Sequence, residues 1–471
     1  MTEPNYFSAF DAKQIVKDYP HDSSFIQRYG KISRDELRSI QESRFLQCVH
    51  RAWRIPFYQR HWRAHGLEEG DIRRLDDLTS IPPYSKADLM KSVRAHPPFG
   101  DFHGMETFTD GSGSRPPVIL QTTSGTTGQP QPLFFGPKSR EIQNLLYVRA
   151  LLLQGMTHDD IVHMLYGFGT VNAGHYVREA ITHFTGALLI TASTGNVTPS
   201  RQQVQLMHTF GSTVLIGFSD YVRKLADVAR EEGFEPGKDV PVRLICSSIG
   251  GDSRELISKT WGGADVFDIY GVGDTGVVAA EGPEMSGLHI WEDGHVVEIV
   301  DPDTLSPIAD GEIGNIVVTS LFKDDIFPNI RFNTNDLSRI LTDSSPTGWT
   351  FRRMGGFLGR SDGMVKLRGI NVYPTAVGEL IRAESHSNGE FLCEVDRIEG
   401  RDELTVRIEV TSQKEDEESL ALHFQKLLRE KIGVSMNIEL VAPGVLAATT
   451  GLEDRQKAVR LVDKRKVLPA N

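Results

Sequence analysis

The chain has 471 residues, 39% of them hydrophobic and 24% charged, with a formal net charge of −12. This composition is typical of a soluble globular enzyme, and the length predicts two or three domains. The acidic balance disfavours a nucleic-acid binder, which usually carries a basic domain or stripe, but it leaves a nucleotide ligand open.

Cysteine usage and the N-terminus predict the compartment. Cys48, Cys246 and Cys393 are odd in number and far apart, which favours neither a disulfide framework nor a zinc site. The N-terminus has no basic patch followed by an apolar run, so no signal peptide is expected. No run of about 18 apolar residues predicts a membrane span. We therefore expect a cytoplasmic protein without a membrane partner.

The first 110 residues are predicted to be mostly helical. The clearest helix begins at Ser33, where Glu36 completes a capping box, and Pro56 is expected to end it. A further short helix is expected to open at Lys86, in a segment where we find no sign of chemistry.

Apolar strands alternate with helical stretches from residue 117 to about 320, which is typical of a mostly parallel, helix-covered sheet. Buried strands are expected at 117–120, 161–165, 186–191, 212–218, 242–247 and 264–270, with helices at 144–154 and 221–232.

The pattern changes after residue 296. Strands at 296–300 and 314–319 have no helix between them, so they predict a small antiparallel subdomain. A domain boundary is expected near 360. Beyond it, strands at 391–398 and 404–410 form a hairpin, followed by a helix at 418–432 and a strand at 436–441. The predicted fold is therefore α/β, with a large N-terminal domain at 1–360 and a small α+β domain at 361–471.

The stretch 121–135, which reads QTTSGTTGQPQPLFF, is the first candidate site. Glycines let backbone N–H groups approach phosphate oxygens, and small hydroxyls add donors without bulk. A flexible surface loop is the alternative. A Walker P-loop is excluded, because no Gly-Lys-Ser/Thr follows.

A second candidate, 268–276, reads DIYGVGDTG and matches the dinucleotide fingerprint G-x-G-x-x-G. That fingerprint should open a helix, and the stretch before Pro283 is too short for one, so we disfavour it. Tyr270 instead offers an aromatic face for a base, and Asp274 a hard oxygen ligand for Mg²⁺. A core tyrosine beside an ordinary turn is the alternative.

Three shorter stretches complete the set. In 331–336, RFNTND, Asp336 could bind both hydroxyls of a ribose at a strand end, or simply bond its own backbone in a turn. The glycines and arginines of 359–369 could be only a linker. Lys457, near the C-terminus, is by itself an ordinary solvated charge.

Taken in order, these stretches resemble the adenylate-forming superfamily of acyl-CoA synthetases, peptide-synthetase adenylation domains and luciferases. The chain is most similar to phenylacetate–CoA ligases, from about Phe45 to Asp463. TSGTTGQP resembles the family's phosphate loop, and DIYGVGD and RFNTND stand where the family has its aromatic-Gly-x-x-Glu and aromatic-Arg-Thr-x-Asp motifs. GRSDGMVKLRGINVYP resembles its hinge motif, and 166–169 and 287–293 add likeness to the phenylacetate branch.

The resemblance implies a role for each matching residue. Lys457 would bridge the carboxylate and the α-phosphate, with Thr126 and Asp274 as further catalytic residues, and Asp274 would help to hold Mg²⁺. Asp362 would be the hinge of a mobile C-terminal domain. The ATP site would comprise Ser124, Gly125, Thr126, Thr127, Gly128, Gly250, Gly251, Asp252, Tyr270, Gly271, Asp336 and Arg360, and the acid pocket Tyr166, Phe168, Gly169, Ile249 and Gly250.

The implied function is ATP-dependent adenylation of a small aromatic carboxylic acid, followed by transfer of the acyl group to coenzyme A. The resemblance also admits relatives that load carrier proteins, form amides or activate nitrite, and an inactive nucleotide-binding protein is the non-enzyme alternative. A homodimer would suit the phenylacetate branch. Asp274 is one methylene shorter than the family's usual Glu, and Gly273 and Asn333 also depart from common family residues.

Overall fold

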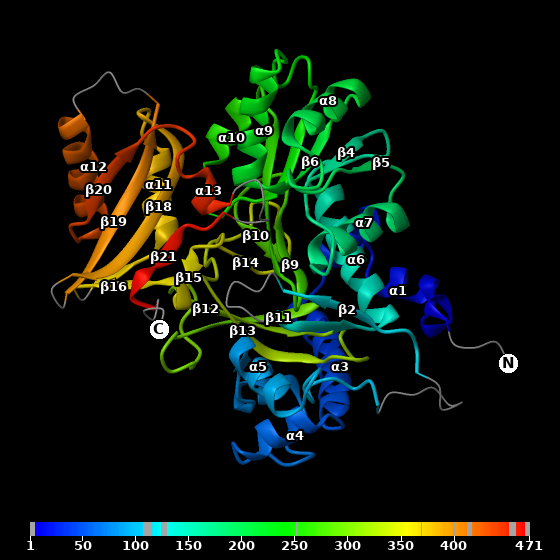
Figure 1. Cartoon of the computed structure of the whole chain (residues 1–471). Coiled ribbons are helices and arrows are strands. Elements are labelled where there is room, and N and C mark those ends of the chain that lie inside the picture. The colour runs from blue at the N-terminus through cyan, green and yellow to red at the C-terminus, as the bar shows by residue number, and fades with distance from the viewer. Residues whose placement is uncertain are drawn as a thin grey trace. The chain divides into compact units, whose positions relative to one another are not determined.

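The computed structural model describes residues 5–106, 115–123, 130–250, 253–368, 370–398, 401–411, 417–451 and 458–466. Figure 1 shows the helices and strands along the chain. The chain forms two compact units. The first unit comprises Met1–Thr191 and Phe267–Gly356, and the second comprises Ala192–Val266 and Phe357–Asn471. No helix in the described ranges is long and apolar enough to cross a membrane.

Helices dominate the start of the first unit, as predicted. The Ser33 hydroxyl accepts a hydrogen bond from the Glu36 amide at 3.1 Å, which confirms the predicted N-cap. The next helix boundary was predicted wrongly: α3 ends at Ala52, and Pro56 begins α4, where its missing N–H costs no hydrogen bond. The helices are α1 (Ala12–Asp18), α2 (Ser23–Tyr29), α3 (Arg34–Ala52), α4 (Pro56–Arg63), α5 (Lys86–Ala95), α6 (Pro137–Leu153) and α7 (Asn172–Phe184).

The strands of the first unit are both parallel and antiparallel. One sheet has the order β1-β13-β12-β11 and is antiparallel except for the β1–β13 pair, which confirms the predicted antiparallel subdomain. The pair β4–β5 is parallel, whereas β8, β9, β10 and β14 pair antiparallel. Their bounds are β1 (Tyr84–Ser85), β4 (Ile161–Met164), β5 (Leu188–Thr191), β8 (Asp265–Val272), β9 (Gly276–Glu281), β10 (Leu288–Ile290), β11 (His295–Val300), β12 (Gly314–Ser320), β13 (Asn329–Ser338) and β14 (Arg353–Met354).

A separate hairpin joins β2 (Ile119–Thr122) to β3 (Pro132–Phe135). The prediction of a buried strand before the Gly/Thr-rich loop was wrong in burial and in position. Leu120 is 46% exposed and Ile119 is only half-buried, whereas all of β3 is buried. The two-stranded pairing leaves one face of β2 to solvent, so its apolar residues were wrongly taken to indicate a core strand.

The second unit begins with alternating helices and strands: α8 (Ser200–Phe210), β6 (Val214–Phe218), α9 (Ser219–Glu231), β7 (Leu244–Ser248) and α10 (Arg254–Thr260). The strands β6 and β7 pair in parallel, as the alternation predicted. The short strand β15 (Gly359–Arg360) and the 3₁₀ turn Ser361–Gly363 follow where the chain returns to this unit.

Residues 365–466 of the second unit form what we call the C-terminal module. Its sheet has the order β20-β19-β18-β21, and the β18–β19 hairpin confirms the predicted one. Among the described residues, the buried members of its apolar core all belong to the module and lie between Val365 and Met436. The elements are β16 (Val365–Leu367), β17 (Ile370–Val372), α11 (Pro374–Arg382), β18 (Ser387–Ile398), β19 (Arg401–Val410), α12 (Glu417–Ile432), β20 (Asn437–Val441), α13 (Ala447–Thr450) and β21 (Leu461–Asp463).

Candidate active site

The hairpin β2–β3 fixes both ends of the predicted phosphate loop. The Thr123 amide donates to the Gln131 carbonyl at 3.1 Å, so the two ends of the loop lie side by side. The predicted phosphate-binding residues Ser124, Gly125, Thr126, Thr127 and Gly128 lie between them, outside the described residues. The structure shows which side chains surround the two ends of the loop, Thr123 and Gln131.

A lysine that the sequence did not single out lies at the first end. Lys86 Nζ donates to Thr123 Oγ1 at 3.1 Å. Lys86 begins α5, directly after β1, and β1 pairs in parallel with β13 so that Ser85 faces Asn333 of the RFNTND stretch. This register, which no local pattern reveals, brings an ammonium group to the Gly/Thr-rich loop.

The turn between β8 and β9 carries Asp274. A Cβ on Gly271 would lie 2.3 Å from the Gly276 carbonyl oxygen, so the close approach of the two strands requires a glycine there. Strand β9 begins at Gly276, which confirms that no dinucleotide-binding helix follows GVGDTG. Asp274 Oδ1 accepts a hydrogen bond from Gln131 Nε2 at 2.6 Å, so Asp274 lies at the second end of the loop.

Asp274 is 5% exposed, and its electrostatics follow from this burial. Burial raises the pKa of its carboxyl group, and the charge of Lys323 together with the Gln131 hydrogen bond offsets only part of that rise. Lys323 Nζ donates to the Asp274 carbonyl at 2.7 Å and lies over the rings of Phe135 and Phe327. Burial lowers the pKa of Lys323 to about 8.

The donor set around Asp274 fits a magnesium ion that also binds phosphate. No group of three or more His, Cys, Asp and Glu side chains in the described ranges is arranged to hold a metal. Mg²⁺ is commonly held by one or two carboxylates plus substrate phosphates rather than by a protein cage, and a single buried Asp beside a Gly/Thr-rich loop matches that pattern. A bound cation would also relieve the burial of the carboxylate.

Tyr270 and Asp336 form a second group in the same unit. The Tyr270 hydroxyl donates to Asp336 Oδ2 at 3.0 Å and lies 3.3 Å from Thr334 Oγ1. Asp336 lies inside β13 rather than at a strand end, so that detail of the prediction was wrong. The strand is irregular here, because Asn335 has a φ of 60°, and this turns the backbone beside Asp336. The structure thus pairs the predicted base-facing ring with the predicted ribose carboxylate.

The predicted acid-pocket residues Tyr166, Phe168 and Gly169 precede α7. Tyr166 is 8% exposed, Phe168 packs edge-on against the His175 ring at 5.3 Å, and the Gly169 carbonyl is 2.7 Å from His175 Nε2. The Thr122 amide donates to the Thr170 carbonyl at 2.6 Å, so this stretch lies beside the hairpin that carries the loop.

Two buried polar residues that the sequence did not indicate connect α6 and α7 to the Asp274 turn. Asn172 Nδ2 donates to the Gly273 carbonyl at 3.3 Å, and Arg140 Nη1 donates to Asn172 Oδ1 at 2.6 Å. Arg140 Nε also donates to Glu179 Oε2 at 2.5 Å. The predicted helix began only at residue 144, whereas α6 begins at Pro137, so Arg140 lay outside the predicted element.

Four residues spaced i, i+3, i+4 and i+7 form the polar face of α6: Arg140, Gln143, Asn144 and Tyr147, each at most 2% exposed. The helix packs against α7 and β9, and a Cβ on Gly276 would lie 2.5 Å from Gln143 Nε2. Within the described part of the chain, both amide atoms of Gln143 and both of Asn144 have no hydrogen-bond partner.

The other predicted residues belong to the second unit. The Ile249 carbonyl accepts from Ser219 Oγ at 3.2 Å, and Gly250 has a φ of 59°, which suits glycine. Arg360 donates to Asp362 through Nε and Nη2, both at 2.7 Å, so the proposed nucleotide-facing arginine and the hinge aspartate form one exposed ion pair. Gly251, Asp252 and Lys457 lie outside the described residues.

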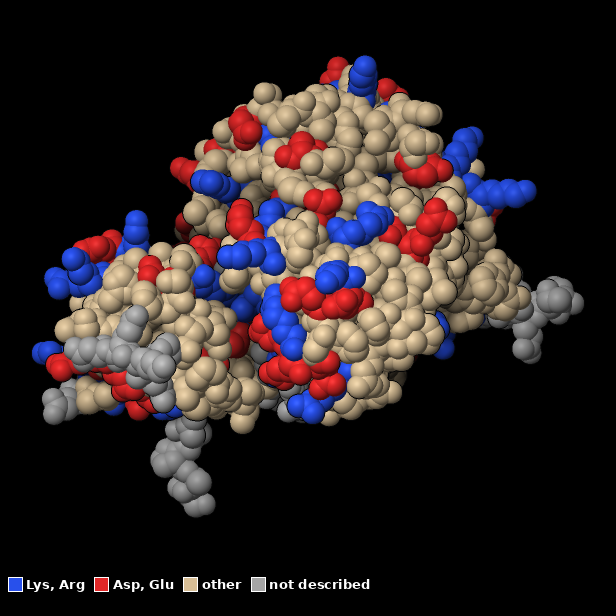
Figure 2. Space-filling view, turned by 90° about the horizontal axis from the view of Figure 1, so that it is seen from above, with Lys and Arg blue, Asp and Glu red and all other residues tan. Residues whose placement is uncertain are grey.

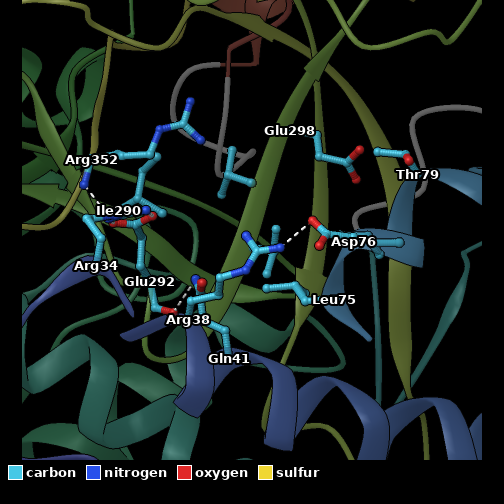
Figure 3. Close-up of a pocket in the computed structure, with 13 residues that line it drawn as sticks. Arg34, Arg38, Gln41, Leu75, Asp76, Thr79, Ile290, Glu292, Glu298 and Arg352 are labelled. Carbon is cyan, nitrogen blue, oxygen red and sulfur yellow. Dashed lines mark hydrogen bonds and ion pairs between the residues drawn. The ribbon is translucent and has the colours of Figure 1, made fainter. Parts of the chain in front are cut away.

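A separate polar pocket in the first unit, of about 250 Å³, contains none of the predicted site residues (Figure 3). Arg34 donates to both carboxylate oxygens of Glu292, at 2.7 and 3.0 Å, and Arg38 pairs with Asp76. The other two charged side chains of the lining, Glu298 and Arg352, pair with Arg331 and Asp310, so each charge of the pocket has a partner. On the face shown in Figure 2, acidic and basic side chains are interspersed, without a continuous basic stripe.

Known proteins resemble this chain along nearly its whole length. Residues 369–465 match the family described as AMP-binding enzyme C-terminal domain. Phenylacetate-coenzyme A ligase of Aromatoleum evansii is 31% identical over 450 residues, which cover 92% of this chain and 96% of that protein. The ligase of the same name from Thermus thermophilus is 30% identical over 464 residues, covering 92% and 98%.

Solved structures agree. 2-Hydroxyisobutyryl-CoA ligase in its postadenylation state, in complex with R3-HIB-AMP, matches with a TM-score of 0.81 at 26% identity, covering 95% of this chain and 94% of that one. The same ligase with 2-HIB-AMP and CoA in the thioesterification state gives a TM-score of 0.65, covering 93% and 91%.

Fold, site and comparisons together define an adenylate-forming enzyme of the AMP-forming ligase class. More narrowly, the chain belongs to the phenylacetate–coenzyme A ligase family.

Proposed function

We propose that this protein uses ATP to activate a small aromatic carboxylic acid as its acyl adenylate and then transfers the acyl group to coenzyme A. One observation carries the proposal: both ends of the Gly/Thr-rich loop lie against groups suited to ATP phosphates, Lys86 at Thr123 and Asp274 at Gln131. The Tyr270–Asp336 pair in the same unit supports a nucleoside beside those phosphates.

The proposed reaction explains why these groups are needed. A carboxylate oxygen forms a bond to the α-phosphorus and pyrophosphate leaves, so two anions must approach each other. Lys457 is expected to bridge the carboxylate and the α-phosphate, and Lys86 to hold the loop end against phosphate charge. Mg²⁺ held by Asp274 and phosphate oxygens would offset part of this negative charge. In the second step the thiolate of CoA attacks the acyl carbon and AMP leaves.

Residues 1–360 would bind ATP and the acid. Residues 361–471 would bring Lys457 to the reaction. Asp362 would be the hinge. The exposed Arg360–Asp362 ion pair supports this role, because an exposed pair contributes little to stability and can break as the backbone turns.

The cellular setting is also a proposal. Cys48, Cys246 and Cys393 are free and buried, which suits a reducing cytoplasm. The proposed acyl acceptor is CoA. The proposed assembly is a homodimer, and light scattering would test this oligomeric state.

Acid-dependent exchange of pyrophosphate into ATP tests the proposal directly. We expect exchange with arylacetic or benzoic acids, and thioester formation when CoA is added. The panel should include aliphatic acids and nitrite, with a carrier protein and amines as other acceptors. Exchange with none of these, despite ATP binding, would instead favour an inactive nucleotide-binding protein.

A further inference from the structure

The contact between α9 and the C-terminal module within the second unit is ionic. Asp220 lies in the first turn of α9, and its Oδ2 is 2.9 Å from Arg460 Nη2. Its Oδ1 is 3.2 Å from Arg223 Nη2 and 3.6 Å from Arg382 Nη2. Three guanidinium groups therefore surround one carboxylate.

A second carboxylate completes the group. Glu390 of β18 accepts from Arg460 Nη1 at 2.8 Å and lies 3.3 Å from Arg223 Nη2. We call Asp220, Arg223, Arg382, Glu390 and Arg460 the charge cluster. Arg223 and Arg460 each reach both carboxylates, so each bridges α9 and the module.

The charge cluster is largely shielded from solvent, with side chains 7–20% exposed. Burial alone would raise the pKa of Asp220, but Arg460, Arg223 and Arg382 outweigh burial and hold that pKa below its usual range. A carboxylate in this position depends on its partners, and removing one of them weakens the compensation of a shielded charge.

Around these ion pairs the contact is open rather than close-packed. A cavity of about 740 Å³ lies between α8–α9 and the module, lined by Lys224 and Asp227 on one side and Glu409 and Ala447 on the other. The apolar core of the module is complete without this contact. A polar, loosely packed contact of this kind is typical of domains that can move relative to each other.

Arg460 is held in place by a backbone hydrogen bond and lies close to Lys457 in the sequence. Its carbonyl accepts from the Cys393 amide at 3.0 Å, and β21 begins at the next residue. Lys457 lies three residues earlier, so its Cα is within about 11 Å of the Arg460 Cα. A guanidinium held by Asp220 therefore restricts where the lysine can reach.

We propose that Asp220 and Arg460 are positioning residues: with Arg223 and Glu390 they form a latch that holds the C-terminal module, and thus Lys457, in the arrangement used for adenylation. The latch must open before the module can serve the thioester step. This inference rests on the proposed function, since it assigns the latch to one of its two half-reactions.

The two half-reactions separate a positioning role from a structural one. Asp220→Asn and Arg460→Gln should each lower pyrophosphate exchange by about tenfold or more, because each removes the 2.9 Å ion pair between α9 and the module and leaves the remaining shielded charges unbalanced. Thioester formation from preformed acyl adenylate and CoA should be unchanged or faster. Arg465→Gln is the matched control, because Arg465 pairs with Asp402 and Asp463 at the other end of β21, wholly inside the module.

A distance measurement tests the latch without turnover. The native cysteines are buried, so spin labels would attach at Lys238→Cys and Lys426→Cys, two exposed positions on either side of the contact. The parent protein with ATP should give one narrow distance distribution. Adding Arg460→Gln should broaden it, whereas Arg465→Gln should not.

The outcomes distinguish this inference from the proposed function. Equal losses in both half-reactions, a selective loss of the thioester step, or unchanged exchange would each overturn the latch. An unaltered distance distribution in the Arg460→Gln protein would also overturn it. A wild-type protein without acid-dependent exchange would refute the proposed function, and the distance distributions would then decide alone whether the contact is a latch.

Discussion

Two regions of this protein bury polar side chains, and they differ in whether those side chains have partners. In the charge cluster of the second unit, each carboxylate lies within 3.6 Å of guanidinium groups, and two arginines reach both carboxylates. On the polar face of α6 in the first unit, Gln143 and Asn144 have no hydrogen-bond partners within the described part of the chain, although both are almost fully buried.

The difference between paired and unpaired buried groups affects both the stability of the protein and the positioning of its parts. Burying an amide without partners costs free energy, whereas a well-paired ionic group returns most of its desolvation cost and fixes geometry. The charge cluster therefore defines position, and the polar face of α6 lowers stability beside the Asp274 turn. Four predictions test this contrast, from the largest expected effect to the smallest.

The largest effect is expected from removing Lys457, which is proposed to contact the reacting groups directly and not only to position them. Lys457→Ala should lower pyrophosphate exchange by about 10²–10³-fold, the usual effect of losing one group that stabilises transition-state charge. Circular dichroism should show an intact fold. Lys464→Ala is a suitable control, because the half-exposed Lys464 side chain pairs with Glu394 inside the module. Unchanged exchange in Lys457→Ala would remove this residue from the mechanism.

The sequence predicts most elements of the fold because their signals are local. The Ser33 cap and the 391–410 hairpin are encoded by neighbouring residues, and the structure confirms both. The loop at 121–135 and the carboxylates Asp274 and Asp336 were likewise singled out in advance, as members of ordered motifs.

The rest of the site depends on contacts between distant segments. Lys86 reaches Thr123 because β1 pairs with β13, and Gln131 and Lys323 meet Asp274 from two other parts of the chain. No periodicity or spacing encodes such contacts. Asn172 was missed for the same reason, since its partners Arg140 and Gly273 lie far from it in the sequence.

Lys323 offers a pH-dependent test of how much the burial of a charge costs near Asp274. Its pKa is about 8 in the folded protein and 10.5 without burial, so below pH 8 the folded state carries the full cost of a buried charge. Between pH 8 and 10.5 the unfolded state binds more protons, so stability rises with pH. The free energy of unfolding relative to Lys323→Met should rise by on the order of 3 kcal/mol from pH 7 to 10.5. Urea titrations would measure it, and a pH-independent difference would contradict it.

A smaller effect is expected from lengthening Asp274 to the residue usual in the family. Gln131 Nε2 lies 2.6 Å from Asp274 Oδ1 in a buried site, which leaves no room for another methylene. Asp274→Glu should therefore lower the free energy of unfolding by about 1–3 kcal/mol through overpacking. Gln131→Ser in the same protein should restore part of that loss by making space. A fully stable Asp274→Glu protein would show that the turn adapts and that Gln131 does not set the length of the carboxylate.

The smallest effect tests the contrast between the two regions most directly. Asn144→Leu replaces an amide without partners by an apolar group of similar size, so the free energy of unfolding should stay constant or rise by about 1 kcal/mol. Asn172→Leu is the matched control, because that amide bonds Arg140 and the Gly273 carbonyl, and its loss should cost about 1–3 kcal/mol. Denaturant titration of both variants measures the difference. Equal losses would mean that the Asn144 amide is satisfied in the folded protein, and the two buried regions would then no longer differ in kind.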